Sequence, residues 1–233
     1  MVESEKEHKN AAFLMRIRDR LQRALDEAAF LLAVDPVSAR GLGNYRFFTS
    51  GTVNKAAEAY VFLRKAGRYD ASRMLVRPAL EAAYRLNAVR LDETVFFRIS
   101  YSEFLEEKKW FGSAHRRAGI DKSKETQASL DQFKADYHKH YPSHAMIEQK
   151  FSVRDAAVTA QYENHYETVY RLFCTYTHAA FKAATDDLSD FYEQDTHTVS
   201  FCVLSALWAL VYVNVPIPEL GELWDEIRDI QRT

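Results

Sequence analysis

The sequence predicts an all-α protein, folded as a single-domain bundle of about seven to eight helices. Apolar residues recur every three to four positions through most of the 233-residue chain. Runs of alternating apolar and polar residues are missing, as are the Asn-Gly and Asp-Gly pairs typical of hairpin turns. Most of the 7 glycines fall between periodic segments, where helix boundaries would place them. We expect one domain over residues 1–233, with an N-terminal helix and loop over 1–48 and the bundle core over 49–233.

Composition narrows the class of protein further. Hydrophobic residues make up 47% of the chain, which is enough for a core, and the formal net charge is −2. That charge argues against a generally basic nucleic-acid-binding surface but leaves room for a local basic patch. Cys174 and Cys202 lie in apolar stretches, which suits a reducing compartment better than a disulfide scaffold. The charged N-terminus lacks the apolar core of a signal peptide, so we expect a cytoplasmic protein.

The N-terminal segments follow from periodicity and from proline. Residues 5–34 carry apolar residues at helical spacing and are predicted to form the first helix, which Pro36 stops. Residues 38–50 are expected to form a loop, either anchored by its aromatic residues or used as a contact surface through its arginines. A second helix is expected over residues 53–65.

The third predicted helix, residues 71–90, contains a proline within its periodic pattern. Pro78 removes an amide donor and clashes with the carbonyl four residues earlier, so a kink is expected there. Arg77 and Glu81 lie one turn apart beside this kink. They could form an ion pair on a solvated face or have a buried role, and the sequence leaves both interpretations open.

The most basic part of the chain joins the fourth and fifth predicted helices, residues 94–113 and 124–140. Lysines and arginines are concentrated over residues 108–124, with two aromatic residues among them. Nucleic-acid binding would use such a segment for phosphate contacts and base stacking. A solvated hinge between two helices explains the same composition.

Three histidines follow the fifth predicted helix, at His138, His140 and His144. Histidine is a common metal ligand, but this spacing matches no closed zinc pattern and no cysteine lies near. We therefore expect no metal site and no cofactor.

A central helix is predicted over residues 166–184, after a short helix over 152–161 that Ser152 can cap. Arg171 and His178 are two turns apart on one flank of its apolar stripe, at an axial separation of about 10.5 Å. Glu167 precedes Arg171 by one turn, close enough for an ion pair. A cation and an imidazole at the edge of a core can serve a fold or a reaction.

The C-terminal part contains a long stretch without formal charge, residues 197–218, after a turn at 186–190. Serines, an asparagine and prolines interrupt it, and no basic cluster flanks it. We predict a helix over 199–213 that is buried on all sides against the helix at 166–184, and no membrane insertion. A final amphipathic helix is predicted over 218–231.

Two short motifs resemble a widespread bacterial all-helical family without assigned activity. Its pattern is R-S/P-x-x-E on one helix and Y-x-x-x-S-x-x-x-H on a later one, and the matching residues here are Arg77, Glu81, Tyr170 and His178. Cys174 occupies the serine position. The resemblance covers roughly residues 49–215. If the proline-containing helix packs on the central helix, Arg77 or Glu81 should lie within hydrogen-bond reach of Tyr170 or His178. The candidate ligand-binding residues are Arg77, Glu81, Tyr170 and Glu167.

The same helix more distantly resembles the HEPN superfamily, whose nuclease members carry arginine, four to six residues, then histidine. Arg171 and His178 are separated by six residues, and Leu172 stands where active members often have a polar residue. The resemblance implies a homodimer that cuts RNA without metal. His178 would be the general acid or base and Arg171 would hold the scissile phosphate, oriented by Glu167.

Two functions from different classes therefore remain open. The first is a HEPN-like, metal-independent endoribonuclease of an RNA-processing or defence system. The alternative is a non-catalytic helical module that binds a nucleotide, a small polar ligand or a protein partner. For His178 itself, a third interpretation is a core histidine hydrogen-bonded to Glu81 or to a tyrosine.

Overall fold

The computed structural model describes residues 5–34, 41–118, 123–143, 148–178 and 192–232; within these ranges the side chains of 5–7, 110–118, 123, 126, 140, 175–178, 192–193 and 230–232 are not described. The helices are α1 (Glu5–Val34), α2 (Leu42–Lys65), α3 (Tyr69–Met74), α4 (Val76–Leu91), α5 (Val95–Ala118), α6 (Ser123–His140), α7 (Val153–Thr159), α8 (Glu163–His165), the π-helical turn η1 (Tyr166–Tyr170), α9 (Arg171–His178), α11 (Tyr192–Val211) and α12 (Leu220–Arg232). No strand occurs in these ranges, so the all-α prediction is confirmed, with main helices close in number to the prediction.

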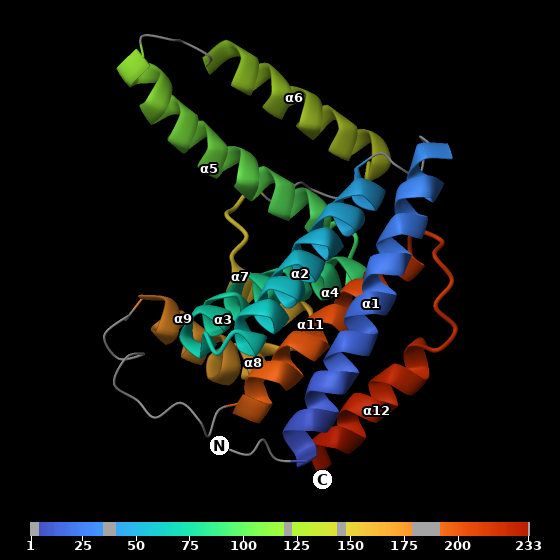
Figure 1. Ribbon diagram of the computed structural model, residues 1–233. Coiled ribbons are helices and arrows are strands. Elements are labelled where there is room, and N and C mark those ends of the chain that lie inside the picture. Colours follow the sequence, from blue (N-terminus) through green and yellow to red (C-terminus); the bar gives the residue numbers. More distant parts are fainter. Residues whose placement is uncertain (1–4, 35–40, 119–122, 144–147, 179–191, 233) are drawn as a thin grey trace.

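Helix α11 forms the centre of the bundle (Figure 1). Its closest neighbours are α1, α4 and α2, with α12 packed alongside. Val203, Leu204 and Leu207 are fully buried within it, as the absence of charge from residues 197–218 predicted. The helix begins at Tyr192, seven residues before its predicted start, and ends at Val211. The predicted packing against residues 166–184 is wrong for the described part of that range. An apolar face predicts that a helix is buried, but it does not specify which helices cover it.

None of the helices in the described ranges is long and apolar enough to cross a membrane.

The loop predicted over residues 38–50 is wrong from position 42 onward, where α2 begins; residues 38–40 lie outside the described ranges. Gly43 and Gly51 lie inside α2 and not between helices. Each glycine within a helix costs roughly 0.5–1 kcal/mol relative to alanine. Tertiary contacts offset this cost, including the buried Arg46, which forms an ion pair of 2.8 Å with Glu93.

At the kink predicted near Pro78, the helix is interrupted at Leu75. Helix α3 ends at Met74, and α4 begins two residues later, which places Pro78 in the first turn of α4. There the missing amide costs little, because the first amides of a helix have no carbonyl partner within it. Pro78 therefore lies just after the interruption at Leu75, whose backbone remains in the α region.

The central helix predicted over residues 166–184 is divided into η1 and α9 as far as it is described, and its residues 179–184 lie outside the described ranges, as does the turn predicted at 186–190. The π-helical turn widens the backbone from Tyr166 to Tyr170. Such turns often occur at functional sites. The apolar stripe of this segment had suggested a uniform α-helix.

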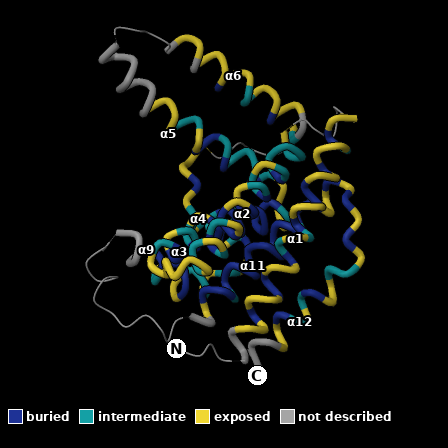
Figure 2. The backbone as a smooth tube through the Cα atoms, in the orientation of Figure 1, coloured by how far each residue is buried: buried dark blue, intermediate teal, exposed yellow. Residues whose placement is uncertain are grey.

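Helices α5 and α6 form a hairpin that projects from the bundle (Figure 1). We call it the arm. Its inner side is an aromatic contact: the Phe97 ring centroid lies 5.6 Å from that of Phe133 and 4.9 Å from that of Tyr137, and Phe104 lies 5.5 Å from Phe133. Much of the described outer surface of the arm is exposed, whereas the centre of the bundle is buried (Figure 2).

Candidate functional site

Three residues of the predicted site meet at the contact between α4 and η1. The Nε of Arg77 donates to Oε1 of Glu81 at 3.0 Å, and the hydroxyl of Tyr170 donates to the same oxygen at 2.7 Å. The Arg77 guanidinium carbon is 6.0 Å from the centroid of the Tyr170 ring. The sequence predicted such a contact between the proline-containing helix and Tyr170, and the hydrogen bond confirms it.

This cluster lies at the boundary between core and solvent. Tyr170 is 5% exposed, whereas the side chains of Arg77 and Glu81 are 26% and 27% exposed. Burial and the hydrogen bond to Glu81 raise the pKa of Tyr170, which therefore keeps its proton and remains a donor. Both earlier interpretations of Arg77 and Glu81 are thus partly right, because they form an ion pair across one turn and also contact a buried side chain.

Aromatic rings surround Tyr84 behind the cluster. The Tyr84 hydroxyl is hydrogen-bonded to Nδ1 of His165 at 2.7 Å, and its ring centroid lies 6.1–6.4 Å from those of Tyr162, Tyr166 and Tyr170. Tyr166 and Tyr170 are stacked at 4.8 Å, one turn apart along η1. Burial lowers the pKa of His165 to about 4, so this imidazole is neutral near pH 7.

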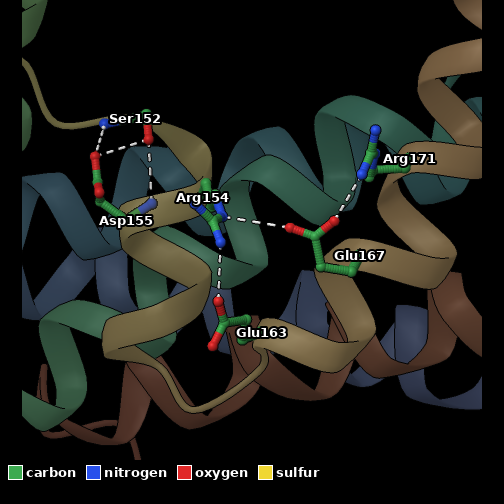
Figure 3. Close-up of polar contacts among 6 residues, drawn as sticks. All are labelled: Ser152, Arg154, Asp155, Glu163, Glu167 and Arg171. Atoms are coloured by element: carbon green, nitrogen blue, oxygen red, sulfur yellow. Dashed lines mark hydrogen bonds and ion pairs between the residues drawn. The ribbon is translucent and has the colours of Figure 1, made fainter.

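A chain of alternating charges runs over the surface beside this cluster (Figure 3). Arg171 contacts Glu167 at 2.8 Å, Glu167 contacts Arg154 at 3.3 Å, and Arg154 contacts Glu163 at 3.1 Å. The ion pair of Arg171 and Glu167 that the sequence predicted is therefore present. It lowers the pKa of Glu167 and raises that of Arg171, because each charge stabilises the other.

Helix α7 holds Arg154 at the other end of this chain of charges. Ser152 caps the helix, as predicted, through a reciprocal pair of bonds (Figure 3): the Asp155 amide donates to Ser152 Oγ at 3.1 Å, and the Ser152 amide donates to Asp155 Oδ2 at 2.8 Å. This capping box fixes the first turn of α7, which carries Arg154. The sequence predicts the cap at Ser152 but gives no signal for a role of Arg154.

The exposure of Arg171 determines what its ion pair can do. Its side chain is 68% exposed and that of Glu167 is 37% exposed. Exposed ion pairs contribute little stability, because water and salt screen them. Glu167 thus contacts the guanidinium at 2.8 Å, while 68% of the Arg171 side chain remains exposed to solvent.

His178 is the last residue of α9, and its side chain lies outside the described part of the structure. The backbone from Arg171 to His178 is α-helical, so these two positions are two turns apart on one face of α9. Among the described residues, no group of three or more His, Cys, Asp or Glu side chains could hold a metal ion. Of the predicted histidine cluster, His140 and His144 have no described side chain.

The structure thus brings most of the predicted site together at one point of the chain, the junction of η1 and α9. Tyr170 ends η1 and contacts α4, and Arg171 begins α9 and faces solvent. Two further residues of this region, Arg154 and His165, were not among the predicted site residues. Arg154 lies on another helix and belongs to no motif, and His165 precedes the apolar stripe that drew attention to this region.

The fold and these contacts define a class of protein: an all-helical bundle with a charged and aromatic cluster at a π-helical junction. The model of a family of unknown function, DUF5677, matches residues 47–196, more than half of the chain. The chain therefore belongs to this family, in agreement with the predicted membership of a family without assigned activity. No curated protein and no solved structure gives a significant match.

Proposed function

We propose that the protein is a HEPN-like endoribonuclease that cleaves RNA without a metal ion, in an RNA-processing or defence system. The observation that carries this proposal is the exposed guanidinium of Arg171, which Glu167 orients at 2.8 Å. His178 lies two turns later on the same face of α9. A positioned cation and an imidazole are the two groups that this reaction requires.

In the proposed reaction, Arg171 binds the scissile phosphate and neutralises the charge that develops on it. The ribose 2′-hydroxyl attacks phosphorus and loses its proton, and the 5′-oxygen of the next nucleotide leaves and gains one. His178 transfers a proton at one of these two oxygens. Imidazole suits this step because its ordinary pKa of about 6.5 lies near neutral pH. The products are a 2′,3′-cyclic phosphate and a 5′-hydroxyl.

Arg77, Glu81 and Tyr170 have a positioning role in this proposal. The hydrogen bond from Tyr170 to Glu81 ties the end of η1 to α4. Arg171 is the next residue, so the same bond fixes the start of α9 and the backbone from which the Arg171 side chain extends. Catalytic groups need this support, since small displacements strongly reduce rates.

The proposal extends to assembly and location. A homodimer would bring together two copies of α9 and form one composite site, as the HEPN resemblance implies. The protein would act in the cytoplasm, where its RNA substrate is found.

A second candidate function is a non-catalytic module that binds a nucleotide, a small polar ligand or a protein partner through the cluster of Arg77, Glu81 and His178. Tyr170 is joined to this cluster by its hydrogen bond to Glu81. One observation favours it: Leu172, at the position where active HEPN members often carry a polar residue, packs against the hydrophobic core. In this function Arg77 would bind an anionic group of the ligand, because its side chain is about one quarter exposed.

Two substitutions on α9 test the proposed activity. We expect His178→Ala to reduce cleavage of single-stranded RNA by ~10²–10⁴-fold, because it removes the proton-transferring group. Arg171→Ala should reduce it by a similar factor, ~10²–10³-fold, because the phosphate loses a positioned donor. Cleavage of a fluorescent oligonucleotide in the presence of a chelator measures both effects.

Matched controls separate this loss from general surface effects. Arg228→Ala removes another exposed arginine that forms an ion pair within its own helix, and His138→Ala removes an exposed histidine of the arm. Both should cleave like wild type, and all variants should keep their helical circular dichroism. If folded His178→Ala and Arg171→Ala also cleave like wild type, the nuclease proposal fails.

A further inference from the structure

Positive charge is concentrated at the tip of the arm. Residues 108–118, the last three turns of α5, contain Lys108, Lys109, Arg116 and Arg117 and no Asp or Glu, a charge of +4. The entire chain carries −2, so the rest of it carries −6. This concentration of positive charge favours polyanion binding at the tip.

Nearer the bundle, two lysines on or beside the arm are paired with acidic residues. Lys150 contacts Glu106 at 2.7 Å. Lys134 contacts Glu148 at 2.7 Å. Beyond Glu107 the sequence of α5 has no acidic residue that could form such pairs. The basic surface therefore begins at Lys108, where the arm already projects from the bundle (Figure 1).

Lys108 and Lys109 are exposed at this boundary. Their contacts with Gln127 and Glu106 are long, at 3.4 and 3.5 Å, and lie in solvent. Lys109 and Arg116 are seven residues apart, so they occupy one face of α5 two turns from each other. The cations thus extend along the end of the helix and do not form a single point of charge.

We propose that the tip of the arm binds the phosphate backbone of single-stranded RNA through Lys108, Lys109, Arg116 and Arg117. The proposal rests on the proposed function, because this tip would hold the same RNA that the site on α9 cleaves. Trp110 and Phe111 interrupt the cations in sequence, and aromatic residues beside basic ones are what base stacking uses.

An anionic membrane is a different partner for a basic surface, and the packing of the arm disfavours it. Membrane-bound helices bury an apolar face in the lipid. In the arm this face of α5 is already occupied, since Phe104 packs on Phe133 at 5.5 Å and Phe97 packs on Tyr137 at 4.9 Å. The exposed side chains of α5 that the structure describes, at 103 and 106–109, are all charged. Lysines among them supply what a phosphate backbone binds.

The expected signature is a salt dependence. Each phosphate that a cation neutralises on a single strand contributes about 0.7 to the slope of log K against log salt concentration. Replacing Lys108 and Lys109 should therefore lower this slope by about 1.4. Replacing Arg116 and Arg117 should lower the slope by a similar amount.

The experiment measures binding of a fluorescent single-stranded RNA to full-length protein by anisotropy, in the His178→Ala background so that the RNA stays intact. The tip variant is Lys108→Glu with Lys109→Glu, and a second tip variant is Arg116→Gln with Arg117→Gln. The matched control is Lys55→Glu with Lys65→Glu, which makes the same change in charge at two exposed positions of α2.

We expect the tip variants to bind RNA at least about tenfold more weakly at low salt and with a smaller slope, and the control to bind like the parent protein. Equal weakening by tip and control variants would overturn the proposal, as would binding to anionic phospholipid vesicles without binding to RNA. Cleavage by otherwise wild-type protein is measured separately. If the tip variants weaken RNA binding but wild-type protein cleaves no RNA, the nuclease proposal fails and the RNA-binding arm stands. If wild-type protein cleaves RNA but the tip variants bind it as the parent does, the RNA-binding arm fails and the nuclease proposal stands.

Discussion

At the scale of single residues, the hydroxyl of Tyr170 joins the helices that form the candidate site. It donates to a carboxylate that also accepts from Arg77, so one oxygen of Glu81 holds two partners from two helices. Hydrogen bonds to charged acceptors are stronger than neutral ones, and this one is mostly sheltered from solvent. It should therefore contribute measurably to stability.

Tyr170→Phe tests this contribution. The variant keeps the ring and loses the donor, so we expect the free energy of unfolding to fall by about 1.5 kcal/mol, since Glu81 is one quarter exposed and water can replace part of the bond. Tyr212→Phe is the control, because Tyr212 is 46% exposed. Urea denaturation of both proteins gives the comparison, and equal stability of the two variants would show that the bond contributes nothing.

The buried His165 predicts a dependence of stability on pH. Burial lowers its pKa to about 4 in the folded protein, whereas an unfolded histidine titrates near 6.5. Between these values the unfolded chain binds a proton that the folded protein does not, so stability falls as pH falls. The contribution of this group is complete above pH 6.5 and is lost progressively down to about pH 4.

His165→Gln isolates this effect, because glutamine does not titrate. Between pH 6 and 5 the wild type should lose about 1.2 kcal/mol more stability than the variant, measured by urea denaturation at each pH. His197, whose pKa burial also lowers to about 4, remains in both proteins. So does Asp195, whose pKa burial raises to about 6 and which acts in the opposite sense. Parallel pH profiles for the two proteins would contradict the prediction.

How far the site could be predicted from the sequence depends on where each residue lies along the chain. Arg77, Glu81 and Tyr170 belong to short motifs with helical spacing, and this sufficed to predict their contact. Arg154 comes from a separate helix, and its contact with Glu167 depends on how α7 and η1 pack. Periodicity describes one helix at a time, so such a contact has no signal in it.

At the scale of whole elements, the sequence predicted most helices well and failed where local and tertiary preferences conflict. Helix α1 has the predicted bounds, and α6 and α12 differ from theirs by one or two residues. The start of α2 was missed because its glycines disfavour a helix locally. The π-helical turn was missed because a π-turn and an α-turn present nearly the same apolar stripe over five residues.

Two glycines at the start of α2 give an opposed pair of predictions. Gly41 has a φ of +68°, so Gly41→Ala should destabilise the protein by roughly 1–2 kcal/mol. Gly51 is helical, and a Cβ there would meet nothing within 4 Å, so Gly51→Ala should stabilise it by roughly 0.5–1 kcal/mol. Thermal and urea unfolding measure both changes. Shifts of the same sign would contradict this description of the start of α2.

At the scale of the whole molecule, the neighbours of α11 were beyond prediction, although its burial was not. A helix that is apolar on all sides can be covered by any of several helices. In the folded protein α1, α2 and α4 cover α11. The projection of the arm has the same origin. Its helices bury their apolar faces mainly against each other, so the bundle does not need to cover them.

In this arrangement the proposed cleavage site and the proposed RNA-binding tip lie on separate parts of the molecule. The site at the junction of η1 and α9 rests on the bundle, and the basic tip lies at the far end of the arm (Figure 1). RNA that contacts both would be held at two points. In that case the tip should affect substrate binding, whereas Arg171 and His178 should affect the chemical step.

The central claim is that Arg171 and His178 cleave RNA through attack by the ribose hydroxyl. The most direct measurement is mass spectrometry of the products formed from a single-stranded RNA by wild-type protein in excess chelator. We predict fragments ending in 2′,3′-cyclic phosphate and beginning with 5′-hydroxyl, and no cleavage when the attacked position carries a 2′-deoxyribose. Intact RNA after incubation with folded protein, or fragments with 5′-phosphate ends, would contradict the claim.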